Sequence, residues 1–131
     1  MEVGEFNLYK IRLNLDTLHS KEEKLIFLYG MKKELSRVIK CLSSNKMLGL
    51  RNYARDDIFI EDNCTELMNL LKKILMKYCA NPRDYRYPGE DVLKREIKEE
   101  IKLYNRFDDL IDMEIEQVKS DNRRINQYSS T

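Results

Sequence analysis

The clearest pattern of apolar and polar positions lies in the C-terminal third of the chain. Apolar side chains recur there in alternating steps of four and three residues, which predicts one α-helix over residues 90–119. The stretch from 91 to 118 would be about 42 Å long at the usual helical rise. That exceeds the diameter expected of a compact chain of this length, so one end should project or pack on another chain. The stripe consists of Ile97, Ile101, Tyr104, Asp108, Ile111, Ile115 and Val118.

Two further helices are predicted upstream of this one, over residues 20–42 and 63–79. Ser20 and Glu23 have the spacing of a capping box, which marks the start of the first. Asn63 and Glu66 form a similar pair at the start of the second. Each pair precedes an apolar stripe at helical spacing: Leu25, Leu28, Tyr29, Leu35, Val38, Ile39 and Leu42 in the first helix, and Cys64, Leu67, Met68, Leu71, Ile74, Leu75 and Tyr78 in the second.

The segment 6–18 fits two periodicities. Tyr9, Ile11, Leu13 and Leu15 alternate with polar residues, which is typical of a strand, whereas Leu8, Ile11, Leu15 and Leu18 have helical spacing. We favour an extended segment or strand, which could pair with residues 56–61 or with a second copy of the chain. Residues 46–61 are expected to form a short helix or loop followed by an extended stretch.

These patterns predict a mostly α fold: a small helical bundle of three principal helices that also allows a short N-terminal strand. Residues 1–118 would form a single helical domain, and the polar residues 119–131 a disordered tail. Composition agrees, since 42% of the residues are hydrophobic, 36% are charged, and only 4 Gly and 2 Pro interrupt the chain. A many-stranded β fold would need more turn residues.

Charge and cysteine content narrow the functional classes. With 24 basic and 23 acidic residues the net charge is +1, so no overall field would draw the protein to nucleic acid or to an anionic membrane. No apolar run is long enough for a membrane span, and the acidic, mixed N-terminal residues lead us to expect no secretory leader. Three scattered cysteines, Cys41, Cys64 and Cys79, are expected to be free thiols in a reducing, intracellular and cytoplasmic setting.

An acidic cluster lies in the second half of the long helix. Asp108, Asp109 and Asp112 resemble the DDxxD pattern of class I prenyl-transfer and terpene-cyclising enzymes, in which carboxylates on one helix hold Mg²⁺ and a diphosphate. The resemblance covers five residues, and the second metal motif of those enzymes is not found here. It would imply a divalent-metal-dependent enzyme, whereas the simpler interpretation is an acidic surface facing solvent or a partner. We assign no cofactor and no catalytic residue.

A second candidate site is the linker before the long helix. Arg83, Tyr85, Arg86 and Tyr87 alternate cations with aromatic rings, the combination that contacts phosphates and stacks on bases. Arg51 and Arg55 could extend such a surface. This pattern supports a nucleic-acid-associated accessory protein as an alternative function.

The function favoured by the sequence is a non-enzymatic interaction or assembly protein. It would be a homodimer or bind a protein partner through the long heptad helix, using Ile101, Tyr104, Asp108, Ile111, Ile115 and Val118. Asp108, the polar member of this coiled-coil-like stripe, would then specify the pairing at some expense of stability.

Overall fold

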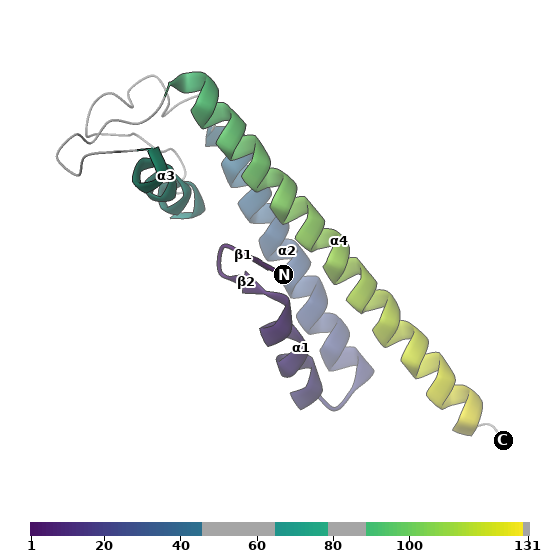
Figure 1. Cartoon of the computed structure of the whole chain (residues 1–131). Coiled ribbons are helices and arrows are strands. Elements are labelled where there is room, and N and C mark those ends of the chain that lie inside the picture. Colours follow the sequence, from purple (N-terminus) through teal and green to yellow (C-terminus); the bar gives the residue numbers. More distant parts are fainter. Residues whose placement is uncertain (46–64, 79–88, 130–131) are drawn as a thin grey trace. The chain divides into compact units, whose positions relative to one another are not determined.

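The computed structural model describes residues 1–45, 65–78 and 89–129, apart from the side chains of residues 44, 45, 90 and 121–129 (Figure 1). Two short antiparallel strands and four helices occur in this part of the chain. The elements are β1 (Glu2–Val3), β2 (Phe6–Asn7), α1 (Leu8–Thr17), α2 (Lys21–Asn45), α3 (Thr65–Tyr78) and α4 (Glu90–Ser129). None of the described helices is long and apolar enough to cross a membrane.

The prediction of a mostly α fold with three principal helices is confirmed. Helices α2 and α3 begin and end within three residues of their expected bounds of 20–42 and 63–79. Helix α4 begins at Glu90 as expected but extends to Ser129. The disordered tail expected for residues 119–131 stays a prediction. The segment 46–61, including its proposed strand 56–61, lies outside the described residues.

The strand favoured for residues 6–18 is wrong for most of that segment, because Leu8–Thr17 forms helix α1. Its buried residues Leu8, Ile11 and Leu15 follow the helical periodicity, while Tyr9 and Leu13, which completed the alternating pattern, are 69% and 48% exposed. Asn7 marks the boundary, since its backbone is extended and its side chain accepts a hydrogen bond from the Lys10 amide at 3.1 Å. This is an N-cap that stops β2 and starts α1.

The N-terminal hairpin depends on Gly4. Val3 pairs with Phe6 and Glu2 with Asn7, which leaves a two-residue turn that begins with Gly4 at a φ of 56°. A Cβ atom at this position would collide with the hydroxyl of Tyr104 on α4. Glycine is thus required both for its backbone conformation and for the close approach of the turn to Tyr104.

The cap of α2 is close to the predicted capping box. The Glu23 amide donates to Ser20 Oγ at 3.1 Å, as expected. The Glu23 carboxylate reaches back one residue further than expected, because it accepts from the amide of His19 at 3.4 Å. Between them the two side chains occupy backbone donors at and just before the start of the helix.

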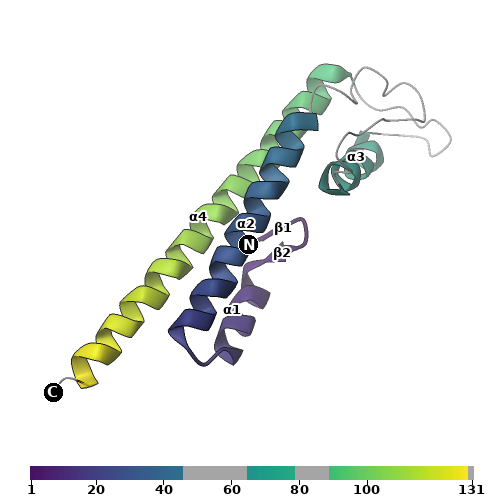
Figure 2. The same cartoon turned by 180° about the vertical axis from the view of Figure 1, so that it is seen from behind.

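The chain divides into two compact units, and helices α2 and α4 contribute to both. Unit 1 comprises Met1–Ser36 and Tyr104–Thr131, and unit 2 comprises Arg37–Leu103. In unit 1, α1 and the first part of α2 lie beside the second part of α4, with the hairpin at one end of α1 (Figures 1 and 2). The core of unit 1 consists of Val3, Leu8, Ile11, Leu15, Leu28, Leu35, Tyr104, Phe107, Ile111 and Ile115.

Unit 2 has its own apolar core, contributed by the remaining parts of α2 and α4 and by α3. Arg37 of α2 pairs with Glu66 of α3 at 2.7 Å at its edge. Met68 and Tyr78, which belonged to the predicted stripe of α3, are instead 46% and 38% exposed. The buried residues are Val38, Cys41, Leu42, Leu67, Leu70, Leu71, Ile74, Leu93 and Ile97.

Cys41 corrects the expectation of three free thiols. Its side chain is 9% exposed and disulfide-bonded. The other two cysteines, Cys64 and Cys79, lie outside the described residues. At least one of the three cysteines is therefore not a free thiol in this structure.

Replacing Gly4 with alanine should destabilise unit 1. The substitution places a Cβ atom in a left-handed backbone conformation and against the Tyr104 hydroxyl, so we expect a loss of about 2 kcal/mol in the free energy of unfolding. Chemical denaturation of Gly4→Ala, Tyr104→Phe and the double variant measures this. The loss should be smaller in the Tyr104→Phe background, because the hydroxyl is absent there. Equal losses in both backgrounds would show that the contact with Tyr104 is unimportant.

Candidate functional site

A cluster of one lysine and three aspartates joins α2 to α4 within unit 1. The ammonium of Lys32 lies 3.2 Å from Asp108 Oδ2 and 2.5 Å from Asp112 Oδ1. Asp108 and Asp112 are one helical turn apart and therefore project from the same side of α4. Lys32 and Asp108 are about one-quarter exposed, while Asp112 is about half-exposed.

Neighbouring charges and burial shift the pKa of Lys32 in opposite directions. The hydrogen bond to Asp112 is the largest influence and raises the pKa of Lys32; partial burial lowers it, and Asp108 raises it further. The net pKa is above the ordinary value, so Lys32 is fully charged at neutral pH. Asp108 Oδ2 accepts a hydrogen bond from the Lys32 ammonium. The other carboxylate oxygen, Oδ1, is buried and has no hydrogen-bond partner among the described residues.

Asp109 completes the acidic cluster that resembled a metal motif. Asp108, Asp109 and Asp112 can each offer one oxygen within 4.8 Å of the others. Two of these carboxylates already bind the ammonium of Lys32. A divalent ion at this position would have to compete with that fixed positive charge. Metal binding by the three aspartates stays a prediction, while the structure accounts for two of them as partners of Lys32.

On a different side of α4, Glu114 is buried and paired with Arg12 of α1. Its residue is 8% exposed, and the Arg12 Nε donates to Oε1 at 2.8 Å. Arg12 itself is 59% exposed, so its guanidinium spans from solvent to the buried carboxylate. The pair joins α1 to α4 and prevents an unpaired charge in the core. Sequence reasoning missed it, because 102 positions separate the two residues and no pattern within one helix relates them.

Aromatic packing closes the hairpin end of unit 1. The ring of Phe6 lies edge-on to Tyr104, with centroids 6.1 Å apart, and 5.7 Å from the ring of Phe107. Phe107 is fully buried and Tyr104 is 2% exposed. These contacts hold the hairpin against the same stripe of α4 that carries Asp108 on its edge.

Unit 2 has a separate polar cluster around Glu96 of α4. Glu96 Oε1 accepts from the Tyr78 hydroxyl at 2.7 Å and from Lys77 Nζ at 3.2 Å. The hydrogen bond from Tyr78 is the main cause of the lowered pKa of Glu96, with Lys77 contributing in the same direction. One turn further along α4, burial raises the pKa of Glu100, which the ammonium of Lys73 only partly offsets.

The six residues predicted to bind a partner divide into two groups. Tyr104, Ile111 and Ile115 lie in the core of unit 1 and are 2%, 0% and 4% exposed. Ile101, Asp108 and Val118 are partly exposed. Partner binding by these residues stays a prediction. A partner of the folded unit could reach only the second group and the outward side of the helix.

The proposed nucleic-acid surface cannot be placed. Arg83, Tyr85, Arg86 and Tyr87 lie outside the described residues, as do Arg51 and Arg55. Nucleic-acid binding through these residues therefore also stays a prediction.

Comparison with known proteins gives no relative from which a role could be transferred. No family model, no curated protein and no solved structure matches this chain. The function has to be inferred from its own side chains.

Removing the ammonium of Lys32 should destabilise unit 1. We expect Lys32→Ala to lower the free energy of unfolding at pH 7 by about 1 kcal/mol, because Asp108 and Asp112 lose their shared cation. Lys24→Ala is the matched control, since Lys24 is also partly exposed on α2 and makes no ion pair with the described residues. Equal losses in the two variants would contradict a specific role for Lys32.

Thermal melting tests the metal hypothesis. Millimolar Mg²⁺ or Mn²⁺ should leave the melting temperature of the unsubstituted protein unchanged, because Lys32 already binds two of the three carboxylates. A metal-dependent rise in melting temperature that is lost in Asp112→Asn would contradict this expectation and support a metal site.

Glu100 should lower the free energy of unfolding by an amount that depends on pH. Because its pKa is raised on folding, ionisation weakens the folded state as pH rises above the ordinary carboxyl range. Glu100→Gln stays neutral and should be more stable than the unsubstituted protein at pH 7. The gain should be under about 1 kcal/mol, because solvent still screens this partly exposed group, and it should vanish in acid.

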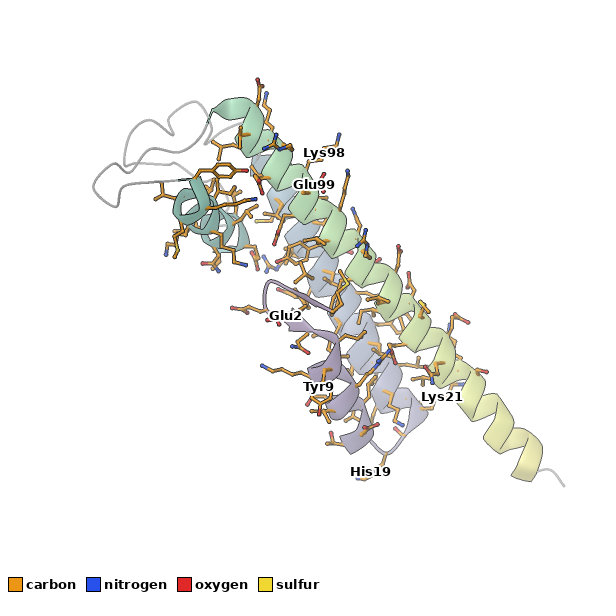
Figure 3. All side chains as sticks on the ribbon, viewed as in Figure 1. Glu2, Tyr9, His19, Lys21, Lys98 and Glu99 are labelled. Atoms are coloured by element: carbon orange, nitrogen blue, oxygen red, sulfur yellow. The ribbon has the colours of Figure 1, made fainter. Side chains whose placement is uncertain are left out.

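Glu99→Gln is the control for this experiment. Glu99, labelled in Figure 3, lies on α4. It is 60% exposed and pairs with Lys102 at 3.2 Å. Thermal or urea denaturation from acid to neutral pH should show no pH-dependent gain for this variant. An equal gain in both variants, or none in Glu100→Gln, would refute the inference about burial.

Proposed function

We propose that this chain is a non-enzymatic assembly protein that forms a homodimer through the outward side of helix α4. The observation that carries the proposal is the charge on that side of the helix. Asp109, Asp112 and Glu116 are all exposed on α4. Asp112 is shared with Lys32 and Glu116 lies 3.8 Å from Lys119, so Asp109 is the one of the three that has no ion pair among the described residues. Exposed acidic groups on a rigid helix favour a partner that supplies positive charge.

The length of α4 supports the same proposal. Its 40 residues correspond to about 60 Å of helix. Its buried residues lie between Leu93 and Ile115, and the opposite side of the helix is exposed over that stretch. A long helix with one side buried is a common basis for helix–helix association.

A non-enzymatic role fits the chemistry of the charged groups. Glu114 is paired with Arg12, and Asp108 and Asp112 with Lys32. These pairs stabilise contacts between helices, and nothing in them resembles a nucleophile held by a base. The proposal therefore assigns the acidic pattern of α4 to packing and recognition.

The disulfide at Cys41 bears on the cellular location expected from the sequence. A cytoplasmic location stays a prediction, and disulfides persist more readily in oxidising than in reducing compartments. Counting reactive thiols in the unfolded protein before and after reduction tests whether the disulfide at Cys41 is formed.

The particle mass in solution tests self-association directly. Light scattering across a dilution series should give a dimer at high micromolar concentration and a monomer on sufficient dilution. The dimer should weaken as salt is added, because charges on exposed helix faces are screened. A monomer at the highest concentration and low salt would show that the proposal is wrong.

A further inference from the structure

The outward side of α2 carries a stripe with the same spacing as a helix interface. Glu22, Ile26, Tyr29 and Lys33 follow one another in steps of four, three and four residues, and all four are exposed. Ile26 is 74% and Tyr29 48% exposed, although Tyr29 belonged to the predicted core stripe. We call these four residues the α2 outer stripe. Two large apolar side chains at its centre are not needed for the packing of unit 1.

Gly30 lies beside this stripe. A glycine inside a helix costs about 1 kcal/mol relative to alanine. No atom lies within 4 Å of the position that a Cβ would occupy, so the described part of the chain does not require glycine there. A residue without a side chain next to exposed Ile26 instead allows the backbone of another helix to approach closely.

A matching stripe lies on α4. Asp109, Asp112, Glu116 and Lys119 follow in steps of three, four and three residues; the first three are exposed and Lys119 is partly exposed. We call these the α4 outer stripe. Asp112 and Glu114 differ by about 200° around the helix. Because Arg12 of α1 contacts Glu114, α1 lies on the other side of α4 and leaves this stripe uncovered.

The Lys32 cluster fixes how the two stripes are aligned. Helices α2 and α4 run antiparallel in unit 1 (Figures 1 and 2), and Lys32 contacts both Asp108 and Asp112. Lys32 is therefore level with about residue 110 of α4, because both helices rise equally per residue. It follows that Lys33 is level with Asp109, and Glu22 is level with the end of the stripe at Lys119.

We propose that a second copy of this chain packs on this face, so that α2 of each copy lies along α4 of the other. A two-fold axis parallel to the helices keeps every residue at its own level and places each α2 outer stripe opposite the partner's α4 outer stripe. Lys33 then faces Asp109 of the partner subunit, and Glu22 faces Lys119 of the partner subunit. The hydroxyl of Tyr29 comes level with the partner's Asp112, to which it can donate.

Charge complementarity is the argument for a second copy as the occupant. Among the described residues, Lys33, Glu22 and Asp109 have no ion pair. Each is level with an opposite charge when the face meets itself in this orientation, where Lys119 would contact Glu22 of the partner subunit in addition to Glu116 of its own chain, 3.8 Å away. This surface rests on the proposed self-association, and it specifies which residues form the interface.

Reciprocal charge reversal tests the pairing. Lys33→Glu and Asp109→Lys each replace two attractions by two repulsions in a symmetric dimer, so each should raise the dimer dissociation constant about tenfold or more. Mixing the two variants should restore dimerisation. In the mixed dimer the two substituted positions face each other with opposite charges, and the unsubstituted Lys33 and Asp109 form the other contact. Sedimentation equilibrium of each variant and of the mixture measures this.

The mixture also controls for folding, because two misfolded proteins would not rescue each other. Circular dichroism should show unchanged helix content, since Lys33 and Asp109 are exposed. Lys10→Glu, a charge reversal on the exposed side of α1, should leave the dissociation constant unchanged. If neither charge reversal weakens the dimer, or if mixing the variants does not restore it, the dimer interface lies on another surface of the chain. A monomeric unsubstituted protein would instead overturn the proposed function and this interface together.

Gly30→Ala gives an independent test, because it should stabilise the monomer and weaken the dimer. Alanine is the better helix former, so the melting temperature at a concentration where the protein is monomeric should rise. The added methyl group should separate the two α2 helices from their partners, so the dissociation constant should also rise severalfold. A higher melting temperature with an unchanged or lower dissociation constant would overturn the role of Gly30 in the interface.

Discussion

The apolar stripe of α4 is the surface on which both units depend. Leu93 and Ile97 contribute to the core of unit 2, and Tyr104, Phe107 and Ile111 to that of unit 1. No other described helix contributes buried residues over so long a stretch. Burying a large apolar side chain stabilises a fold by about 2 kcal/mol, so these residues dominate the energetics of each core. The charged groups then decide which sides of the helix face which neighbours.

In unit 1, two ion-pair clusters determine which sides of α4 face α1 and α2. Arg12 reaches Glu114 from α1, and Lys32 reaches Asp108 and Asp112 from α2. Partly buried pairs add little net stability compared with apolar contacts, but removing one partner leaves a costly charge behind. Their effect is to assign α1 and α2 to different sides of α4. The proposed interface begins on the side of α4 that is left over.

Local periodicity predicted α2, α3 and the start of α4, because the residues of an amphipathic stripe lie only three or four positions apart in the sequence. Local periodicity gave the wrong prediction at residues 8–17, where the apolar residues fit both a strand and a helix. The N-cap at Asn7 favours the helix there. The candidate site was predicted only in part: spacing placed Asp108 and Asp112 on one side of a helix. It could not show that Lys32 binds both, because 76 positions separate Lys32 from Asp108. Such contacts depend on how helices pack, and the pattern within any single helix carries no information about them.

The Lys32 cluster also has a consequence for how the chain finds its fold. The stripe of α4 nearly repeats after seven residues, so α4 could slide along α2 by two turns and still bury apolar side chains. Such a slide would replace Asp108 and Asp112 opposite Lys32 by one of two other pairs, Ile115 with Lys119 or Ile101 with Asn105. The first arrangement opposes two ammonium groups, and the second leaves one without a counterion. A single lysine thereby raises the free energy of both misaligned packings of α4 on α2, and the Arg12–Glu114 pair, which either slide would also break, acts in the same direction.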